Sequence, residues 1–297
     1  MPLALPHARV SGERVHDTSL VPKGKLLKRP PSFPVRDYTA LVERVRALQA
    51  HGWQVSEAGE VCGNPLLTAE RSYGIDHPQV LLVGGIHGDE PAGVEAAVRW
   101  MESGLADRWP VDWLVLPCAN PCGWLLDRRT ASANHDLNRS FNLAECCDEI
   151  RIIRAALAGR RFLFSMDLHE DSDAPGYYIC EIKAGRPFAG EQVIAAVESI
   201  LPIWDVPTLD GRKVAARGCV RRSPMSISTL HRRRLWPLEF HLLRHHTAHT
   251  FCSETPMSFT MEQRVNAHHA ALETALNVII ENSPVPTPGV LGTETRV

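Results

Sequence analysis

His87 and Glu90 stand three residues apart, directly after an aliphatic run in the segment VLLVGGIHGDEPAG. A histidine and a carboxylate on one turn can face the same ion, and His169, which ends the apolar run at 162–168, offers a second imidazole. Zinc favours this combination of ligands, and three protein ligands leave a fourth position for water, as in catalytic sites. The spacing alone is weak evidence, because 14 histidines give about one such pair by chance.

Other polar residues also follow apolar runs. Glu254 ends a run at 248–253, and the long polar loop after the run at 112–117 carries three more candidates, Arg129, Asn138 and Arg139. In open α/β sheets, ligands bind beyond the carboxyl ends of the strands. We therefore expect these side chains to meet at one edge of a sheet.

The elements that must position these residues alternate along the chain. Apolar runs and alternation predict strands at 53–55, 65–70, 80–85, 112–117, 162–168, 176–182 and 248–253. Helical spacing of apolar residues predicts helices at 36–49, 90–101, 144–158, 191–201 and 258–281. This order favours a single-domain, three-layer α/β/α sandwich around a mixed, mostly parallel twisted sheet. Residues 205–235 match neither pattern.

The chain of 297 residues, 44% of them hydrophobic, is long enough for one large core. We predict a catalytic domain over 35–283, a flexible basic arm over 1–34 and a flexible tail over 284–297, because both ends lack periodicity. There is no internal repeat.

Charge and composition narrow the function. A net charge of −2 creates no field that collects nucleic acid or anionic membrane, so we expect a small substrate and neither of those partners. The N-terminus lacks the pattern of a signal peptide, and no apolar run is long enough for a membrane span, which predicts a cytoplasmic protein. The eight cysteines form no C-x-x-C pair and are expected to be reduced thiols.

Four motifs resemble the zinc carboxypeptidase family, in its branch close to succinylglutamate desuccinylase and aspartoacylase. They are, in order, GGIHGDEPAG, HDLNRSF, DLHED and FCSETP followed by a predicted long helix, and the similarity runs over residues 38–281. The resemblance implies the carboxypeptidase-like fold and one Zn²⁺ per chain, held by His87, Glu90 and His169.

The same resemblance implies roles for the remaining polar residues. Asn138 and Arg139 would bind the terminal carboxylate of the substrate, since a guanidinium can bond both of its oxygens. Arg129 would polarise the scissile carbonyl and stabilise the oxyanion, and is favoured over its neighbour Arg128 by its spacing from the N-R pair. Glu254 would act as general base on a zinc-activated water and then as acid toward the leaving amine. Its rival is Glu239, in the apolar run LWPLEFHLL.

Two further hypotheses concern residues outside this set. The segment HLLRHHTAH, with His241, His245, His246 and His249, offers an i, i+4 pair such as His245 and His249 for a second metal, and Glu170 and Asp171 could assist it. A polar helix face is the favoured interpretation. Asp167, two residues before His169, would lie on the same face of its strand. It either orients that histidine or is a buried structural residue.

The resemblance implies a metallocarboxypeptidase that hydrolyses an amide bond next to the free carboxylate of a short or unusual peptide. The alternative is an N-acyl amino acid deacylase using the same metal site, since the short separation of Glu90 and His169, 79 positions, resembles that of the compact deacylase and murein-peptide branch. A non-catalytic module that binds peptide carboxylates is the third hypothesis. The sequence does not set the oligomeric state.

Overall fold

The structure is a computed structural model, and it describes residues 36–74, 77–183, 185, 187–209, 212–222 and 234–282. The arm predicted at 1–34 and the tail predicted at 284–297 lie outside the described residues.

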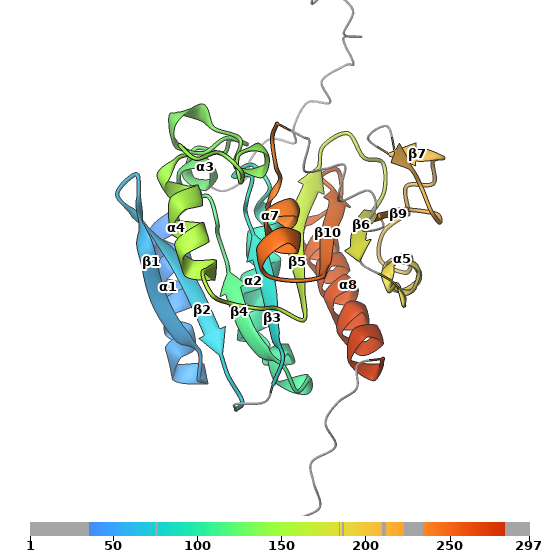
Figure 1. Cartoon of the computed structure of the whole chain (residues 1–297), viewed down its shortest axis with the longest axis horizontal. Coiled ribbons are helices and arrows are strands. Elements are labelled where there is room, and N and C mark those ends of the chain that lie inside the picture. The colour runs from blue at the N-terminus through green and yellow to red at the C-terminus, as the bar shows by residue number, and fades with distance from the viewer. Residues whose placement is uncertain are drawn as a thin grey trace, which may run out of the picture. The chain divides into compact units, whose positions relative to one another are not determined.

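A mixed sheet of eight strands forms the centre of the described fold (Figure 1). Its strands are, in spatial order, β1 (Gln54–Val61), β2 (Asn64–Arg71), β4 (Asp112–Leu116), β3 (Gln79–Gly84), β5 (Phe164–Asp171), β10 (His249–Pro256), β6 (Tyr178–Lys183) and β9 (Cys219–Arg222). The central strands β4, β3, β5 and β10 are parallel, whereas β1, β2 and β6 join antiparallel. Two short strands, β7 (Thr208–Leu209) and β8 (Arg212–Lys213), pair separately.

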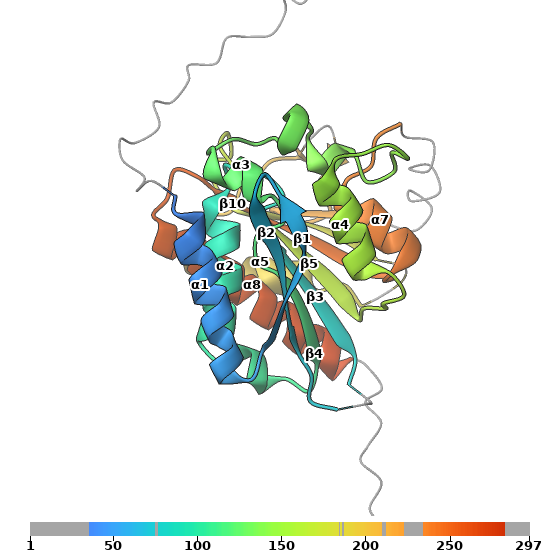
Figure 2. The same cartoon turned by 90° about the vertical axis from the view of Figure 1, so that its left-hand side faces the viewer.

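Helices cover both faces of this sheet (Figure 2). One layer holds α1 (Tyr38–Ala47), α2 (Pro91–Glu102), α5 (Gly190–Val197) and α8 (Met261–Glu281), and the other holds α4 (Asp148–Leu157) and α7 (Leu238–His245). Along β3, Val80 and Leu82 pack into the first layer while Leu81 and Val83 pack into the second. The predicted three-layer α/β/α sandwich is therefore confirmed.

Local sequence signals set several helix ends. The side chain of Asp37 accepts a hydrogen bond from the backbone of Ala40 and caps α1. Thr260 and Gln263 form a capping box at the start of α8. Shorter helices lie at η1 (Leu48–His51), η2 (Leu105–Arg108), α3 (Pro121–Leu125), η3 (Ser132–Asn134) and η4 (Leu137–Arg139). No described helix has the length and apolarity that crossing a membrane requires.

Some boundaries differ from those predicted. The strand expected at 53–55 is the eight-residue β1, whose sequence QVSEAGEV is mostly exposed or half-buried and therefore lacks an apolar pattern. The helix expected from about residue 144 begins at Asp148, where two acidic residues occupy the first turn.

The expectation that all cysteines are reduced is wrong for one pair. Cys62 in the β1–β2 turn and Cys122 in α3 form a disulfide, with Cα atoms 6.0 Å apart. The other six cysteines form no disulfide within the described residues. Pairing of residues 60 positions apart depends on tertiary structure, which spacing along the chain does not reveal.

Candidate active site

The register of the central strands brings the predicted site residues to one edge of the sheet. Gly84 of β3 lies opposite Leu168 of β5, and His169 of β5 lies opposite Glu254 of β10. These three strands are parallel, so their carboxyl ends meet. The edge holds His87, Glu90, His169 and Glu254, as the order of strands and polar residues predicts.

The three candidate metal ligands converge. Nδ1 of His87 lies 2.6 Å from Oε1 of Glu90, and Nδ1 of His169 lies 2.7 Å from Oε2 of the same carboxylate. All three side chains are buried, and a ligand atom from each lies within 4.8 Å of the others. One carboxylate between two imidazoles is a donor set that fits a single divalent cation such as zinc.

The charges in this cluster stabilise one another. Burial acts to raise the pKa of Glu90, but the imidazoles of His87 and His169 outweigh it and lower that pKa to about 2. Burial acts to lower the pKa of His169, but Asp167 and Glu90 raise it well above its usual value. The pKa of His87 is raised in the same way by Glu90 and Asp136. Cationic character is therefore favoured at this point, whether carried by protons or by a metal.

The second ring nitrogen of each histidine also faces a carboxylate. Nε2 of His169 lies 2.9 Å from Oδ2 of Asp167, and Nε2 of His87 lies 3.3 Å from Oδ1 of Asp136. Such partners orient an imidazole and fix which nitrogen faces a metal. Asp167 thus has the contact expected of an orienting residue, whereas Asp136 was missed in the sequence, although it is the acid of HDLNRSF.

Glycines allow the backbone to approach closely around these ligands. A Cβ on Gly93 in the first turns of α2 would lie 2.3 Å from the carbonyl oxygen of Leu168, and one on Gly88 would lie 1.9 Å from the backbone of Gly123. A larger residue at position 93 would push α2 away from β5, and one at position 88 would push the loop carrying His87 away from α3. The glycines of GGIHGDEPAG therefore help to place the cluster.

Arg129 lies beside the cluster, and its neighbour Arg128 does not. Nε of Arg129 is 3.1 Å from Oδ2 of Asp136, and its Nη1 is 3.5 Å from Oε1 of Glu90. The side chain is 43% exposed, so one side of the guanidinium faces solvent. Arg128 instead donates to the backbone carbonyls of Thr130 and Ala131.

Asn138 and Arg139 take different positions. Asn138 is buried, with its Nδ2 3.3 Å from Nε2 of His169, and its Oδ1 accepts a hydrogen bond from the backbone N–H of Leu238. Arg139 is exposed and donates to the carbonyl oxygen of Asn138. The first therefore joins α7 to the centre of the site, while the second lies at its outer edge.

Glu254 and its rival Glu239 both lie close to His169. Burial, together with the negative charge of Glu90, raises the pKa of Glu254 to about 8, and the thiol of Cys252 donates to its Oε1 over 3.3 Å. Glu239 is buried as well, and ligand atoms of His169, Glu239 and Cys252 lie within 4.8 Å of one another. Burial and Asp167 raise the pKa of Glu239. The structure therefore adds Cys252 to the surroundings of the site.

The opposite face of the same strands carries a supporting network. The backbone N–H of Glu170 donates to the carboxylate of Glu90 over 3.1 Å. The carboxylate of Glu170 itself accepts from the backbone N–H of Ala92 and pairs with Arg264 of α8. This buried ion pair joins β5, α2 and α8 behind the candidate ligands. The pairing of Glu170 with Arg264 was not predicted, because it depends on how α8 packs against β5.

The second metal site suggested by His245 and His249 is not formed. His249 is buried, and its Nε2 lies 2.8 Å from Oε1 of Glu181, whereas His245 is exposed at the end of α7. Among the described residues, each group with metal-ligand geometry contains His169.

Comparisons with known proteins bear on the family and the fold. Residues 76–196 match the model of the succinylglutamate desuccinylase/aspartoacylase catalytic domain. No curated protein sequence matches the chain. The fold is similar to that of a candidate metallopeptidase from Shewanella amazonensis, with a TM-score of 0.68 and 22% identity over 82% of this chain and 93% of the other.

Two carboxypeptidases share the fold at lower identity. Carboxypeptidase A from Helicoverpa armigera gives a TM-score of 0.59 at 14% identity, over 83% of this chain and 73% of the other. A metallo-carboxypeptidase from Burkholderia cenocepacia gives 0.57 at 18% identity, over 82% and 68%. The resemblance to a zinc carboxypeptidase-like family close to succinylglutamate desuccinylase is confirmed.

Proposed function

We propose, starting from this relationship, that the protein is a zinc-dependent hydrolase that cleaves an amide bond next to a free terminal carboxylate of a short or unusual peptide. The family match and the shared fold support the broader class, a hydrolase of the metallocarboxypeptidase or deacylase kind. The observation that carries the proposal is the convergence of His87, Glu90 and His169 beside Arg129 and Glu254.

The residues present fit a zinc ion. Two imidazole nitrogens and a carboxylate oxygen would hold it, and Asp136 and Asp167 would orient the two imidazoles from behind. When bound, such an ion supplies a Lewis acid that polarises a carbonyl and lowers the pKa of water. A three-ligand set leaves room for substrate, which favours a catalytic role over a structural one.

Glu254 is the proposed general base and acid. Its pKa of about 8 lies near neutral pH, where a carboxyl group can both accept a proton from water and return it to the leaving amine. Its position opposite His169 places it next to the candidate ligands. Glu239 is more deeply enclosed among Asp167, His169 and Cys252, which leaves it less suited to reach a substrate.

Two arginines would interact with the negative charges of the substrate and of the reaction. Arg129 would stabilise the charge that develops on the scissile carbonyl oxygen, because a fixed cation needs no reorganisation during the reaction. Arg139, exposed at the edge of the site, would bind the substrate carboxylate with two hydrogen bonds. Asn138 would assist it from the centre of the site.

A deacylase that removes an acyl group from an N-acyl amino acid is the second candidate. The match of residues 76–196 to the succinylglutamate desuccinylase/aspartoacylase domain favours it. Both reactions hydrolyse an amide near a carboxylate, so the same residues would serve either.

A paired substrate screen tests the proposal. The purified chain is analysed for metal and then assayed on a panel of dipeptides and a panel of N-acyl amino acids, each with and without a chelator, and with C-terminally amidated peptides as the control. We expect chelator-sensitive cleavage of free-carboxylate peptides and little cleavage of the amidated ones. Cleavage of N-acyl amino acids alone would establish the deacylase. Absence of metal and of activity on both panels would contradict the proposal.

A further inference from the structure

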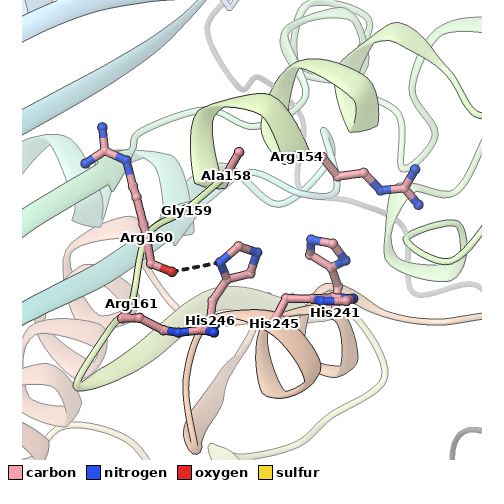
Figure 3. Close-up of a pocket in the computed structure, with 8 residues that line it drawn as sticks. All are labelled: Arg154, Ala158, Gly159, Arg160, Arg161, His241, His245 and His246. Carbon is pink, nitrogen blue, oxygen red and sulfur yellow. Dashed lines mark hydrogen bonds between the residues drawn. The ribbon is translucent and has the colours of Figure 1, made fainter.

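A second cluster of histidines lines a cavity of about 360 Å³ at the other end of the sheet (Figure 3). Its walls come from the end of α4, the segment that leads into β5, and the end of α7, and comprise Arg154, Ala158, Gly159, Arg160, Arg161, His241, His245 and His246. The cavity lies at the amino end of β5, and the candidate active site lies at its carboxyl end. His169 lies five positions after Phe164, the first residue of β5, which separates the cavity from the candidate metal ligands by about 17 Å.

The charged side chains of the cavity wall are all cations. Arg160 is neutralised by a two-pronged ion pair with Glu70, at 2.7 and 2.8 Å, and Figure 3 shows its guanidinium directed away from the imidazoles. Arg154 donates to the backbone carbonyls of Phe141 and Leu143 and to Sγ of Cys146, none of which cancels its charge. Arg161 is exposed beside them, and no carboxylate of the described residues forms a salt bridge with it or with Arg154.

Burial and the neighbouring positive charges lower the pKa values of the three imidazoles. Burial, together with His246, His245 and Arg154, lowers the pKa of His241 to about 3. Nε2 of His241 is buried and has no hydrogen-bond partner in the described structure, which leaves a polar group that a ligand would satisfy. The rings lie 4.9 to 6.0 Å apart, close enough to act on one molecule.

The partial negative charges at the helix ends offset only part of this positive charge. α4 and α7 both end at the cavity, and each helix end carries about half a negative charge. Together they offset about one positive charge, whereas Arg154 and Arg161 carry two and Arg160 is balanced by Glu70. An uncompensated positive charge therefore remains in the cavity even when every imidazole is neutral.

We propose that this cavity binds a phosphoryl group, either inorganic phosphate or the phosphate of a small phosphomonoester. Guanidinium groups and imidazoles are the side chains that bond a tetrahedral oxyanion, and the volume admits an organic substituent as well. A divalent cation is disfavoured here, because the neighbouring arginines repel it. No three of these histidines, nor any of them with other described residues, form a group with metal-ligand spacing.

The test is isothermal titration calorimetry of the full-length protein with inorganic phosphate at low ionic strength, compared between wild type, Arg161→Gln and Arg151→Gln. Arg151 is the matched control: it lies on α4, is exposed and pairs with Asp148, outside the cavity wall. We expect saturable binding that weakens about tenfold or more in Arg161→Gln and is unchanged in Arg151→Gln. Circular dichroism and thermal unfolding of each variant would show that the fold is intact.

A second arm separates the two sources of the phosphoryl group. Glycerol 2-phosphate is titrated into the same three proteins, and tighter binding than that of inorganic phosphate would identify a phosphomonoester as the ligand, whereas weaker binding would identify free phosphate. A His241→Phe variant, which keeps the ring volume and removes both nitrogens, should also weaken binding. Equal loss in Arg161→Gln and Arg151→Gln, or no saturable binding of either probe to wild type, would overturn the proposal. These outcomes do not depend on hydrolytic activity.

Discussion

The two histidine clusters of this protein lie at opposite ends of β5 and have opposite electrostatic surroundings. At the carboxyl end, His87 and His169 face carboxylates through both ring nitrogens, contributed by Glu90, Asp136 and Asp167. At the amino end, the three imidazoles of the cavity are surrounded by arginines. Histidine is therefore suited to bind a cation at the carboxyl end of β5 and an anion at its amino end.

The directions of the pKa shifts express this difference. Neighbouring carboxylates raise the pKa of His169 despite its burial, whereas burial and neighbouring cations lower that of His241. A histidine count or an i, i+4 spacing cannot distinguish the two cases. The charges that other elements bring within a few ångströms decide what an imidazole binds.

Replacing Glu254 by Gln is expected to have the largest effect on the carboxylate-rich end. The amide keeps the shape of the side chain but cannot accept a proton, so turnover should fall by about 10²–10⁴-fold while bound zinc stays near one per chain. Steady-state kinetics and metal analysis measure both quantities. The matched variant Glu239→Gln should lose much less activity, and the reverse order would move the general base to Glu239.

Changing His169 to Ala removes one of the three proposed metal ligands. Zinc affinity, measured by competition with a chromogenic chelator, should fall more than about 100-fold, because loss of a direct ligand exceeds the usual cost of losing an orienting residue. His241→Ala, from the other cluster, serves as the control and should leave zinc affinity unaltered. Equal zinc affinity in the two variants would contradict the proposal that zinc binds at the carboxyl end of β5 and not at its amino end.

Asp167→Asn tests the orienting contact behind His169. The amide retains size but not charge, so zinc affinity should fall by about 10–100-fold with the fold preserved. Asp136→Asn should act similarly through His87. An unchanged zinc affinity in both variants would mean that the carboxylates serve only the fold.

A smaller effect is expected from pH at the arginine-rich end. Burial and the facing cations Arg154, Arg161 and Arg244 hold the histidine pKa values below their usual range, while the carbonyl oxygen of Arg160 acts to raise the pKa of His246 and the guanidinium of Arg160 pairs with Glu70. A bound anion would raise those pKa values, so binding should take up protons and strengthen a few-fold as the pH falls from about 7.5 to 5.5. Sulfate, which does not titrate in this range, is the probe, and calorimetry in two buffers of different ionisation enthalpy counts the protons. Proton release on binding would be inconsistent with this picture.

Much of this arrangement was predictable from the sequence. Polar residues placed directly after apolar runs indicated which side chains would meet, because parallel strands share one carboxyl edge. The exposed β1 left no apolar alternation to recognise. The contact of Asp136 with His87 and the pairing of Glu170 with Arg264 were missed because they depend on helix packing and on loop paths rather than on spacing along the chain. The arginine-lined cavity escaped prediction for the same reason, since its walls come from two segments, 154–161 and 241–246, that lie at least 80 positions apart in the chain.

The bond between Cys62 and Cys122 encloses His87 and Glu90 in a covalent ring of about 60 residues and leaves His169 outside it. Cross-linking a loop of that length removes chain entropy from the unfolded state equivalent to about 4 kcal/mol. Purification in a thiol reductant would therefore open the ring and compete for the metal at the same time. A phosphine reductant, which does not bind zinc, would open the ring alone, and a chelator added to a separate sample would remove the metal alone. Comparing the two samples would separate the effect of losing the disulfide from the effect of losing the metal.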